Sequence, residues 1–139
     1  MSPFRIREAD KSDREDMDYV RNIWRNTFRM SGLGHNIATP DEQLFAAEMK
    51  RVFAFLLPSA TIRIACDQKD ETNRVGFAVA TVYELHYAYV NGDFRKLGLV
   101  PKMLDGLKIT QCTFLTMAGV RRMKPKERGW SYCPRYTIH

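Results

Sequence analysis

The sequence of 139 residues has few cysteines and few histidines, and this limits the chemistry that it can support. It contains three of each, and Cys66, Cys112 and Cys133 show no C-x-x-C spacing of the kind found in zinc and redox motifs. An odd, widely spaced set of cysteines argues against a disulfide framework and fits a reducing compartment. We therefore expect no metal site and no disulfide, with the three cysteines acting as small core or surface residues.

Long apolar runs are also absent. No stretch approaches the ~20 apolar residues that span a bilayer, and no cationic segment leads into an apolar signal sequence. There is no internal repeat and no linker rich in Gly or Ser. Hydrophobic residues make up 45% of the chain and aromatic residues 12%, which is enough for a folded core. We expect one cytoplasmic domain over residues 1–139, with no membrane partner.

Positive charge is concentrated in the C-terminal third. The formal net charge is +6, yet residues 1–94 hold 12 basic and 14 acidic side chains, a balance of −2. Residues 95–139 hold ten Lys or Arg against Asp105 and Glu127, a balance of +8. This asymmetry indicates either a region that faces an anion or a solvated basic surface. A cofactor phosphate, a nucleic acid and an acidic protein all remain open as that anion.

Hydrophobic periodicity predicts two helices in the N-terminal half. Ser12 and Glu15 form a capping box, and apolar residues then recur every three or four positions over 17–28. A second helix starts at Thr39, has proline in its first position, and is stopped by Pro58. The apolar faces of both helices are expected to be core.

The spacing then changes to that of strands. Residues 61–67 and 74–82 are short and β-branched, and the polar turn between them predicts an antiparallel hairpin, followed by a third strand at 83–90. Further strands are expected at 4–10, 109–116 and 130–138, the last at a sheet edge, and further helices at 103–107 and 117–128. The order β-α-α-β-β-β-α-β-α-β predicts an α/β (α+β) domain with a mixed, mostly antiparallel sheet flanked by helices.

A basic loop joins the third strand of this run to the next helix, in the segment VNGDFRKLGLVPKML (90–104). The first N–H groups of a helix have no intrahelical partner, and the helix dipole adds positive charge there. Gly98 permits close approach of the backbone, and Arg95, Lys96 and Lys102 add charge, so the loop suits a phosphate group. An ordinary charged turn has the same features, and spacing alone does not decide between the two.

The element order and several motifs together resemble the GNAT (GCN5-related) N-acetyltransferases. The segment FRIREADKSD resembles the first strand and acidic turn of these domains. The segment HYAYVNGDFRKLGLV resembles their strand and R/Q-x-x-G-x-G/A pyrophosphate loop, with Arg95 in the first position and Gly98 in the fourth. MAGVRRMKPKERGW is similar to their late helix, and YCPRY to the closing strand of small members from bacteriophages and prophages. The resemblance covers nearly the whole chain.

This resemblance implies that acetyl-CoA is a co-substrate and that the acetyl group passes directly to a primary amine of a small molecule or a protein. The pyrophosphate is then expected on the loop N–H groups, and the pantetheine arm in a V-shaped opening beside the strand at 83–90. The cofactor-binding residues implied in this way are Val90, Arg95, Lys96, Leu97, Gly98, Leu99 and Val100.

A base that removes a proton from the amine is also implied. Alternation along the strand places Glu84 and His86 on one face together with Ala88 and Val90, and these first two residues are the candidates. Each residue also has an interpretation without a catalytic role. Glu84 can be a carboxylate at the rim of the sheet, and His86 can be a packed, hydrogen-bonded ring.

Three positions depart from the family pattern. Val100 stands where the loop has Gly or Ala, and Pro101 lacks an N–H group that the cradle would use. Pro125 occupies the place in the late helix where members of the family often have a tyrosine acid. Tyr132 or Tyr136 is the candidate to replace it.

Three functions follow from these observations. The first is a phage-encoded, acetyl-CoA-dependent N-acetyltransferase. The second is a catalytically degenerate GNAT-fold protein that acts as a binding or virion-associated component, either as a homodimer or with a virion protein. The third is a nucleic-acid-binding module, since Trp130, Tyr132 and Tyr136 alternate with arginines that can accompany base stacking. Aromatic residues that alternate along a strand are usually core, so the third function is the weakest.

Overall fold

The computed structural model describes residues 3–33, 42–113, 115–116 and 128–132. The longer elements are β1 (Phe4–Glu8), α1 (Arg14–Ser31), α2 (Glu42–Leu56), β3 (Thr61–Asp67), β4 (Arg74–Ala80) and β5 (Glu84–Val90). Shorter elements complete the described residues: β2 (Gly32–Leu33), the 3₁₀ helix η1 (Gly92–Leu97), α3 (Leu99–Met103), β6 (Gln111–Cys112), β7 (Leu115–Thr116) and β8 (Ser131–Tyr132).

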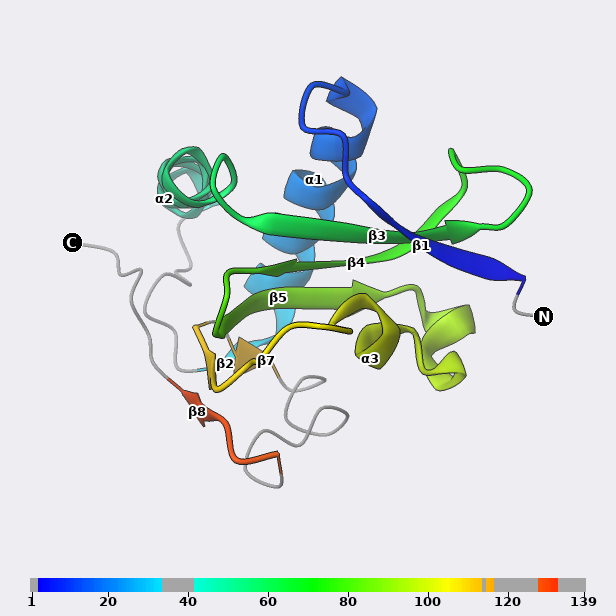
Figure 1. The fold of residues 1–139 in the computed structure, drawn as a ribbon. Coiled ribbons are helices and arrows are strands. Elements are labelled where there is room, and N and C mark those ends of the chain that lie inside the picture. Colours follow the sequence, from blue (N-terminus) through cyan, green and yellow to red (C-terminus); the bar gives the residue numbers. More distant parts are fainter. Residues whose placement is uncertain (1–2, 34–41, 114, 117–127, 133–139) are drawn as a thin grey trace.

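A six-stranded mixed sheet forms the centre of the molecule, with the strand order β1-β3-β4-β5-β6-β8 (Figure 1). The first four strands pair antiparallel, whereas β6 and β8 join in parallel. This confirms the predicted α/β (α+β) domain with a mixed, mostly antiparallel sheet flanked by helices. Within the described residues β8 lies at an edge of the sheet, as predicted.

Helices cover the two faces of the sheet unequally. The long helices α1 and α2 pack on one face over a core rich in aromatic rings, in which Trp24 stacks on Tyr87 with ring centroids 5.1 Å apart. The short α3 lies on the opposite face over smaller side chains such as Ala78 and Val90 (Figure 1). The loop predicted to hold a phosphate belongs to this second face.

A buried ion cluster fastens α1 to the sheet. Arg7 of β1 donates two hydrogen bonds to Asp16 at 2.7 and 2.8 Å, and Arg74 of β4 donates a third at 2.8 Å. The backbone N–H of Asp10 donates a fourth at 3.0 Å. Because these donors stabilise the ionised carboxylate, with the Arg7 hydrogen bond as the largest cause, they hold the pKa of Asp16 well below its usual range.

The predicted capping box at the start of the first helix is wrong. The helix begins at Arg14, and Asp13 Oδ1 accepts the N–H of Glu15 at 3.0 Å. Ser12 instead donates its hydroxyl to Asp10 Oδ1 at 2.6 Å, because the tight turn brings these two side chains together. The predicted start of the second helix at Thr39 lies outside the described residues.

The single strand predicted at 109–116 is also wrong. Strand β6 ends at Cys112, and β7 pairs antiparallel with β2 in a separate two-stranded sheet. The helix predicted at 117–128 lies outside the described residues except for Arg128. The C-terminal strand is described only at Ser131–Tyr132.

Candidate functional site

The loop after β5 is built from two short helical turns joined by a glycine. Asn91 Oδ1 accepts the N–H of Asp93 at 3.2 Å and so caps η1. Gly98 then adopts the left-handed conformation, with φ 70° and ψ 29°, and α3 starts at the next residue. A Cβ atom at Gly98 would have no neighbour within 4 Å, so this backbone position faces open space. The backbone conformation, rather than crowding, therefore requires glycine there.

Several contacts fix this loop against the sheet. The Phe94 ring packs edge-on against Phe4 of β1, with ring centroids 5.1 Å apart. Arg95 donates through Nε to the carbonyl of Val90 at 2.9 Å. At the far end of α3, Arg63 donates to the carbonyl of Met103 at 3.0 Å. The loop is thus held before any ligand arrives.

The predicted phosphate-binding residues differ in exposure. Arg95, Lys96 and Gly98 are exposed, whereas Leu99 is buried and Val100 packs partly against the core beneath α3. Because the Val100 side chain contributes to that core, its bulk is directed at least in part away from the open side of the loop. Leu97 is 49% exposed, whereas Val90, which was also predicted to bind the cofactor, is buried.

Strand β5 pairs with its parallel neighbour β6 only over its first residues. It pairs with β6 at Glu84 and Leu85, and the last contact is the Thr113 N–H to the Leu85 carbonyl at 3.1 Å. The next described strand, β7, pairs with β2 instead. Within the described residues, the edge of β5 from residue 87 to Val90 therefore has no strand partner, and this free edge leads to the loop.

His86 occupies a β-bulge in β5. Val79 pairs with Tyr87 and Ala80 with Leu85, so His86 is the extra residue between them. The bulge breaks the predicted alternation, because Leu85 belongs to the core under α3 whereas Tyr87 belongs to the aromatic core on the other face.

The His86 ring is buried and hydrogen-bonded on both nitrogens. Nδ1 lies 2.7 Å from the Thr113 hydroxyl, and Nε2 lies 3.3 Å from the Thr81 hydroxyl. The ring is 1% exposed. These contacts suit a histidine that holds the end of β4 and the segment after β6 against β5.

Glu84 lies two residues before the bulge residue His86 and is half-buried. With Gln111 of β6 and the turn at 81–83, it lines a pocket of about 390 Å³. Its carboxylate is therefore next to a space that a small polar group can enter.

Tyr132 lies two strands away from Glu84. Register places Leu85, Cys112 and Tyr132 side by side, and Glu84, Gln111 and Ser131 side by side one position earlier. Registered residues point to the same face, so Glu84 and Tyr132 point to opposite faces of the sheet.

Burial raises the pKa of Tyr132, and the neighbouring Cys112 adds to that shift. The Tyr132 hydroxyl is therefore protonated at neutral pH. It is buried, and it has no hydrogen-bond partner among the residues that the structure describes.

Comparison with solved structures identifies the fold. A candidate acetyl transferase from Pyrococcus furiosus superposes with a TM-score of 0.57 at 12% identity, over 97% of this chain and 83% of that one. A candidate acetyltransferase from Clostridium difficile 630 superposes with a TM-score of 0.54 at 11% identity, over 99% of this chain and 97% of that one. The chain has the GNAT fold. No family model and no curated protein matches the sequence.

In this GNAT fold, three features of the site have no clear sequence signal. They are the bulge at His86, the pairing of β2 with β7, and the register of β6 with β8. Each depends on contacts between distant segments, and two of them involve strands of only two residues. Among the described residues, no group of three or more His, Cys, Asp or Glu side chains is placed to hold a metal ion. The described helices include none that is long and apolar enough to cross a bilayer.

Proposed function

We propose that this GNAT-fold protein transfers an acetyl group from acetyl-CoA to a primary amine of a small molecule or a protein. Bound acetyl-CoA supplies an activated acetyl thioester. The residues of this chain bind it, place the amine and move protons.

The observation that carries the proposal is the backbone at Gly98. This left-handed glycine faces open space between two short helical turns, directly after the strand whose edge becomes free. A pyrophosphate there meets the first N–H groups of α3 and the exposed side chains of Arg95 and Lys96. These residues fit the phosphate end of acetyl-CoA in both shape and charge.

The length of β5 suits the rest of the ligand, as does its edge, which has no strand partner among the described residues beyond Leu85. Residues 84–90 span roughly 20 Å at the usual rise per residue, so an extended chain can run from the loop toward Glu84. The amide groups of a pantetheine arm can pair with the backbone edge between 87 and Val90, as an added strand does. The acetyl group would then lie where β5 and β6 separate, and there it can be reached from both faces of the sheet.

We assign the proton transfers to residues on the two faces. Glu84 accepts a proton from the amine that enters the adjacent pocket, and the nitrogen then forms the new bond to the acetyl carbon. The carbon–sulfur bond breaks, and Tyr132 on the other face is the candidate that donates a proton to the departing sulfur. His86 acts as a positioning residue, because both of its ring nitrogens face threonine hydroxyls.

A second candidate function is a GNAT-fold protein that binds a partner without catalysis. Pro101 favours it, because the third residue of α3 has no N–H to offer to a phosphate. The resemblance to phage and prophage members supports a phage origin for such a protein. It would then act in the bacterial cytoplasm or on a virion, and it would do so as a homodimer or with a virion protein.

Calorimetric titration with acetyl-CoA, followed by an assay for released CoA thiol with a panel of amines, separates the two candidates. The enzyme requires both binding and release of thiol that depends on the amine. Glu84→Gln is expected to lower kcat by roughly 100-fold or more while acetyl-CoA affinity stays unchanged. Binding without turnover supports the second candidate, and no binding at millimolar acetyl-CoA contradicts the first.

A further inference from the structure

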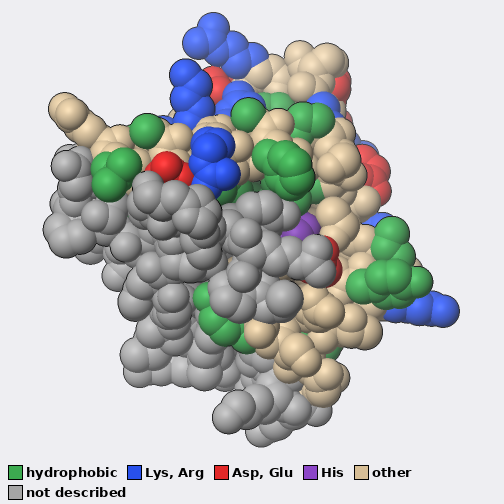
Figure 2. Space-filling view, turned by 90° about the vertical axis from the view of Figure 1, so that its left-hand side faces the viewer, with side chains coloured by type: hydrophobic (Ala, Val, Ile, Leu, Met, Phe, Trp, Pro, Cys, Tyr) green, Lys and Arg blue, Asp and Glu red, His purple; other side chains and the backbone are tan. Residues whose placement is uncertain are grey.

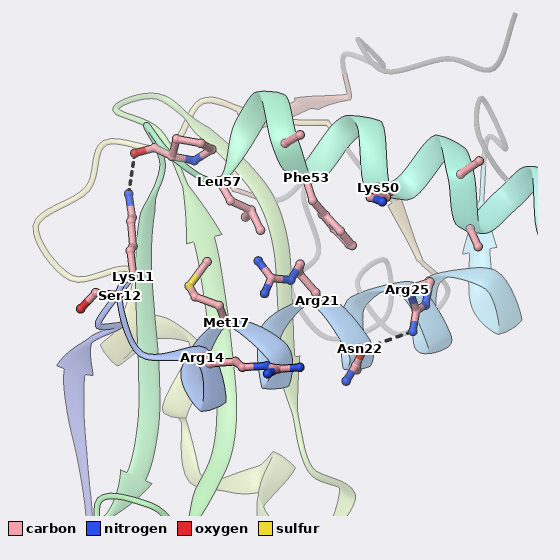
Figure 3. A pocket seen from close by; sticks show the side chains of 14 residues that line it. Lys11, Ser12, Arg14, Met17, Arg21, Asn22, Arg25, Lys50, Phe53 and Leu57 are labelled. Atoms are coloured by element: carbon pink, nitrogen blue, oxygen red, sulfur yellow. Dashed lines mark hydrogen bonds between the residues drawn. The ribbon is translucent and has the colours of Figure 1, made fainter.

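A groove of about 1020 Å³ runs between α1 and α2, on the side of the molecule away from the loop. In Figure 3, Phe53 of α2 and Leu57, the residue after α2, point toward α1, and Arg21 extends from α1 toward Phe53. This groove lies on the helix pair that covers the aromatic core, whereas α3 and the Gly98 loop lie on the opposite face of the sheet. The function proposed above does not use it.

The lining of the groove is strongly basic. Among the described residues that line it there are five cations and no acid: Lys11, Arg14, Arg21, Arg25 and Lys50. Asp18 lies beside the groove and pairs with Arg14 at 3.4 Å and with Arg21 at 3.1 Å, so it offsets one of the five charges. Figure 2 shows Lys and Arg side chains on the upper part of this face, together with hydrophobic side chains and some Asp and Glu. The groove therefore attracts an acidic ligand.

The floor and walls favour a helix over a nucleic acid. Met17, Phe53 and Leu57 form an apolar floor, and the Phe53 ring is only 5% exposed, so no aromatic face is open for base stacking. The α2 wall carries small side chains at Ala47 and Ala54, which allow another backbone to come close. On this side the lining runs from Ala46 of α2 to Leu57 just after the helix, which is about 16 Å or three helical turns.

We propose that this groove, the α1–α2 groove, docks an acidic amphipathic helix of a partner protein. The apolar face of that helix packs on the floor, and its Asp and Glu side chains pair with Arg21, Arg25 and Lys50 along the rims. This inference does not depend on the acetyltransferase activity, because the loop and the groove lie on opposite faces of the sheet.

The test uses a labelled helical peptide of about 16 residues made of Glu, Ala and Leu, with leucines at i, i+3 and i+4 spacing. Its binding is followed by fluorescence anisotropy. We expect binding that weakens with salt. We also expect binding to be lost for a scrambled peptide without an apolar face, and for a peptide with Lys in place of Glu.

Variants locate the binding surface. Arg21→Glu combined with Lys50→Glu is expected to weaken binding roughly tenfold or more. Lys69→Glu combined with Lys108→Glu makes the same change in net charge away from the groove and is expected to leave binding unchanged. Ala54→Trp, which fills the groove without a change in charge, is expected to abolish binding while circular dichroism shows an intact fold.

Several outcomes overturn the proposal. One is no binding at millimolar peptide, and another is equal affinity for the two charge-reversed proteins. Equal binding of polyglutamate or of a single-stranded oligonucleotide shows a general anion surface, and equal binding of phosphatidylserine vesicles shows a membrane surface. Acetyl-CoA titration of the Arg21→Glu/Lys50→Glu protein is a separate control, and it is expected to match the unmodified protein.

Discussion

The sheet face under α1 and α2 is packed with large aromatic side chains, whereas the face under α3 is packed with smaller ones. On the first face, two helices of 18 and 15 residues cover a set of aromatic rings that contact one another in a chain: Phe53, Trp24, Tyr87 and Phe77. The second face is covered by a helix of five residues, and its loop leaves Gly98 open. We infer from this difference that stability is concentrated on the first face and acetyl-CoA binding on the second, so mutations on one face should spare the property of the other.

The largest expected effect comes from the aromatic face. Trp24 is fully buried between Tyr87 and Phe53, and Trp24→Ala should lower the free energy of unfolding by about 3–5 kcal/mol. Leu97→Ala, in the loop on the other face, should change it by less than about 0.5 kcal/mol. Urea denaturation measures both values, and similar losses for the two variants would remove the contrast.

A comparable loss is expected at the ion cluster. Asp16→Asn removes the buried charge that pairs with Arg7 and Arg74, and it should cost about 3–5 kcal/mol, because two half-buried guanidinium groups lose the carboxylate that they share. Asp18→Asn removes an exposed partner of Arg14 and Arg21 and should cost less than about 1 kcal/mol. Equal losses in thermal unfolding would show that the Asp16 cluster adds nothing beyond a surface pair.

The same cluster predicts how stability depends on pH. The folded-state pKa of Asp16 lies below that of the unfolded chain, so its stabilising contribution is present above about pH 4 and is lost as the pH falls toward the folded pKa. The unmodified protein should therefore lose stability below about pH 4 more steeply than Asp16→Asn does. Parallel acid-unfolding curves of the two proteins would contradict this assignment.

A smaller effect is expected where α1 meets β5. The Thr27 hydroxyl donates to the Ile23 carbonyl at 2.6 Å, so the Tyr87 hydroxyl, 2.6 Å from the Thr27 oxygen, is the donor in that second bond. Burial raises the pKa of Tyr87 to about 12. Tyr87→Phe should cost about 1 kcal/mol in urea denaturation, since it removes one hydrogen bond and keeps the ring packing. A loss as large as that of Trp24→Ala would mean that the hydrogen bond, rather than the rings, organises this face.

The sequence allowed much of the fold to be predicted, because the long elements carry local signals. The apolar spacing over 17–28 and the polar turn between β3 and β4 lie within single stretches of chain, and both predictions were confirmed in outline. The split at 109–116 was missed because Leu115 pairs with Leu33, some eighty residues earlier. Strands of two residues carry no periodicity that reveals such a pairing.

The candidate site was predictable in part. The position of the Gly98 loop follows from the order of elements, but the opposite orientations of Glu84 and Tyr132 depend on the register of β6 and β8. The α1–α2 groove was not predicted, because net charge was compared between residues 1–94 and residues 95–139 and not along the faces of single helices. Arg14, Arg21 and Arg25 are spaced by seven and four residues, which places them on one face of α1, and that spacing was available in the sequence.

The most direct test of the central claim, that the Gly98 loop binds acetyl-CoA, is calorimetric titration of two matched glycine variants. Gly98 and Gly106 both have positive φ, at 70° and 81°, and both face open space, so valine imposes a similar backbone cost of about 1–2 kcal/mol at either position. We predict that Gly98→Val abolishes acetyl-CoA binding, whereas Gly106→Val retains the affinity of the unmodified protein. Equal affinity of the two variants would contradict the assignment of the loop as the binding site.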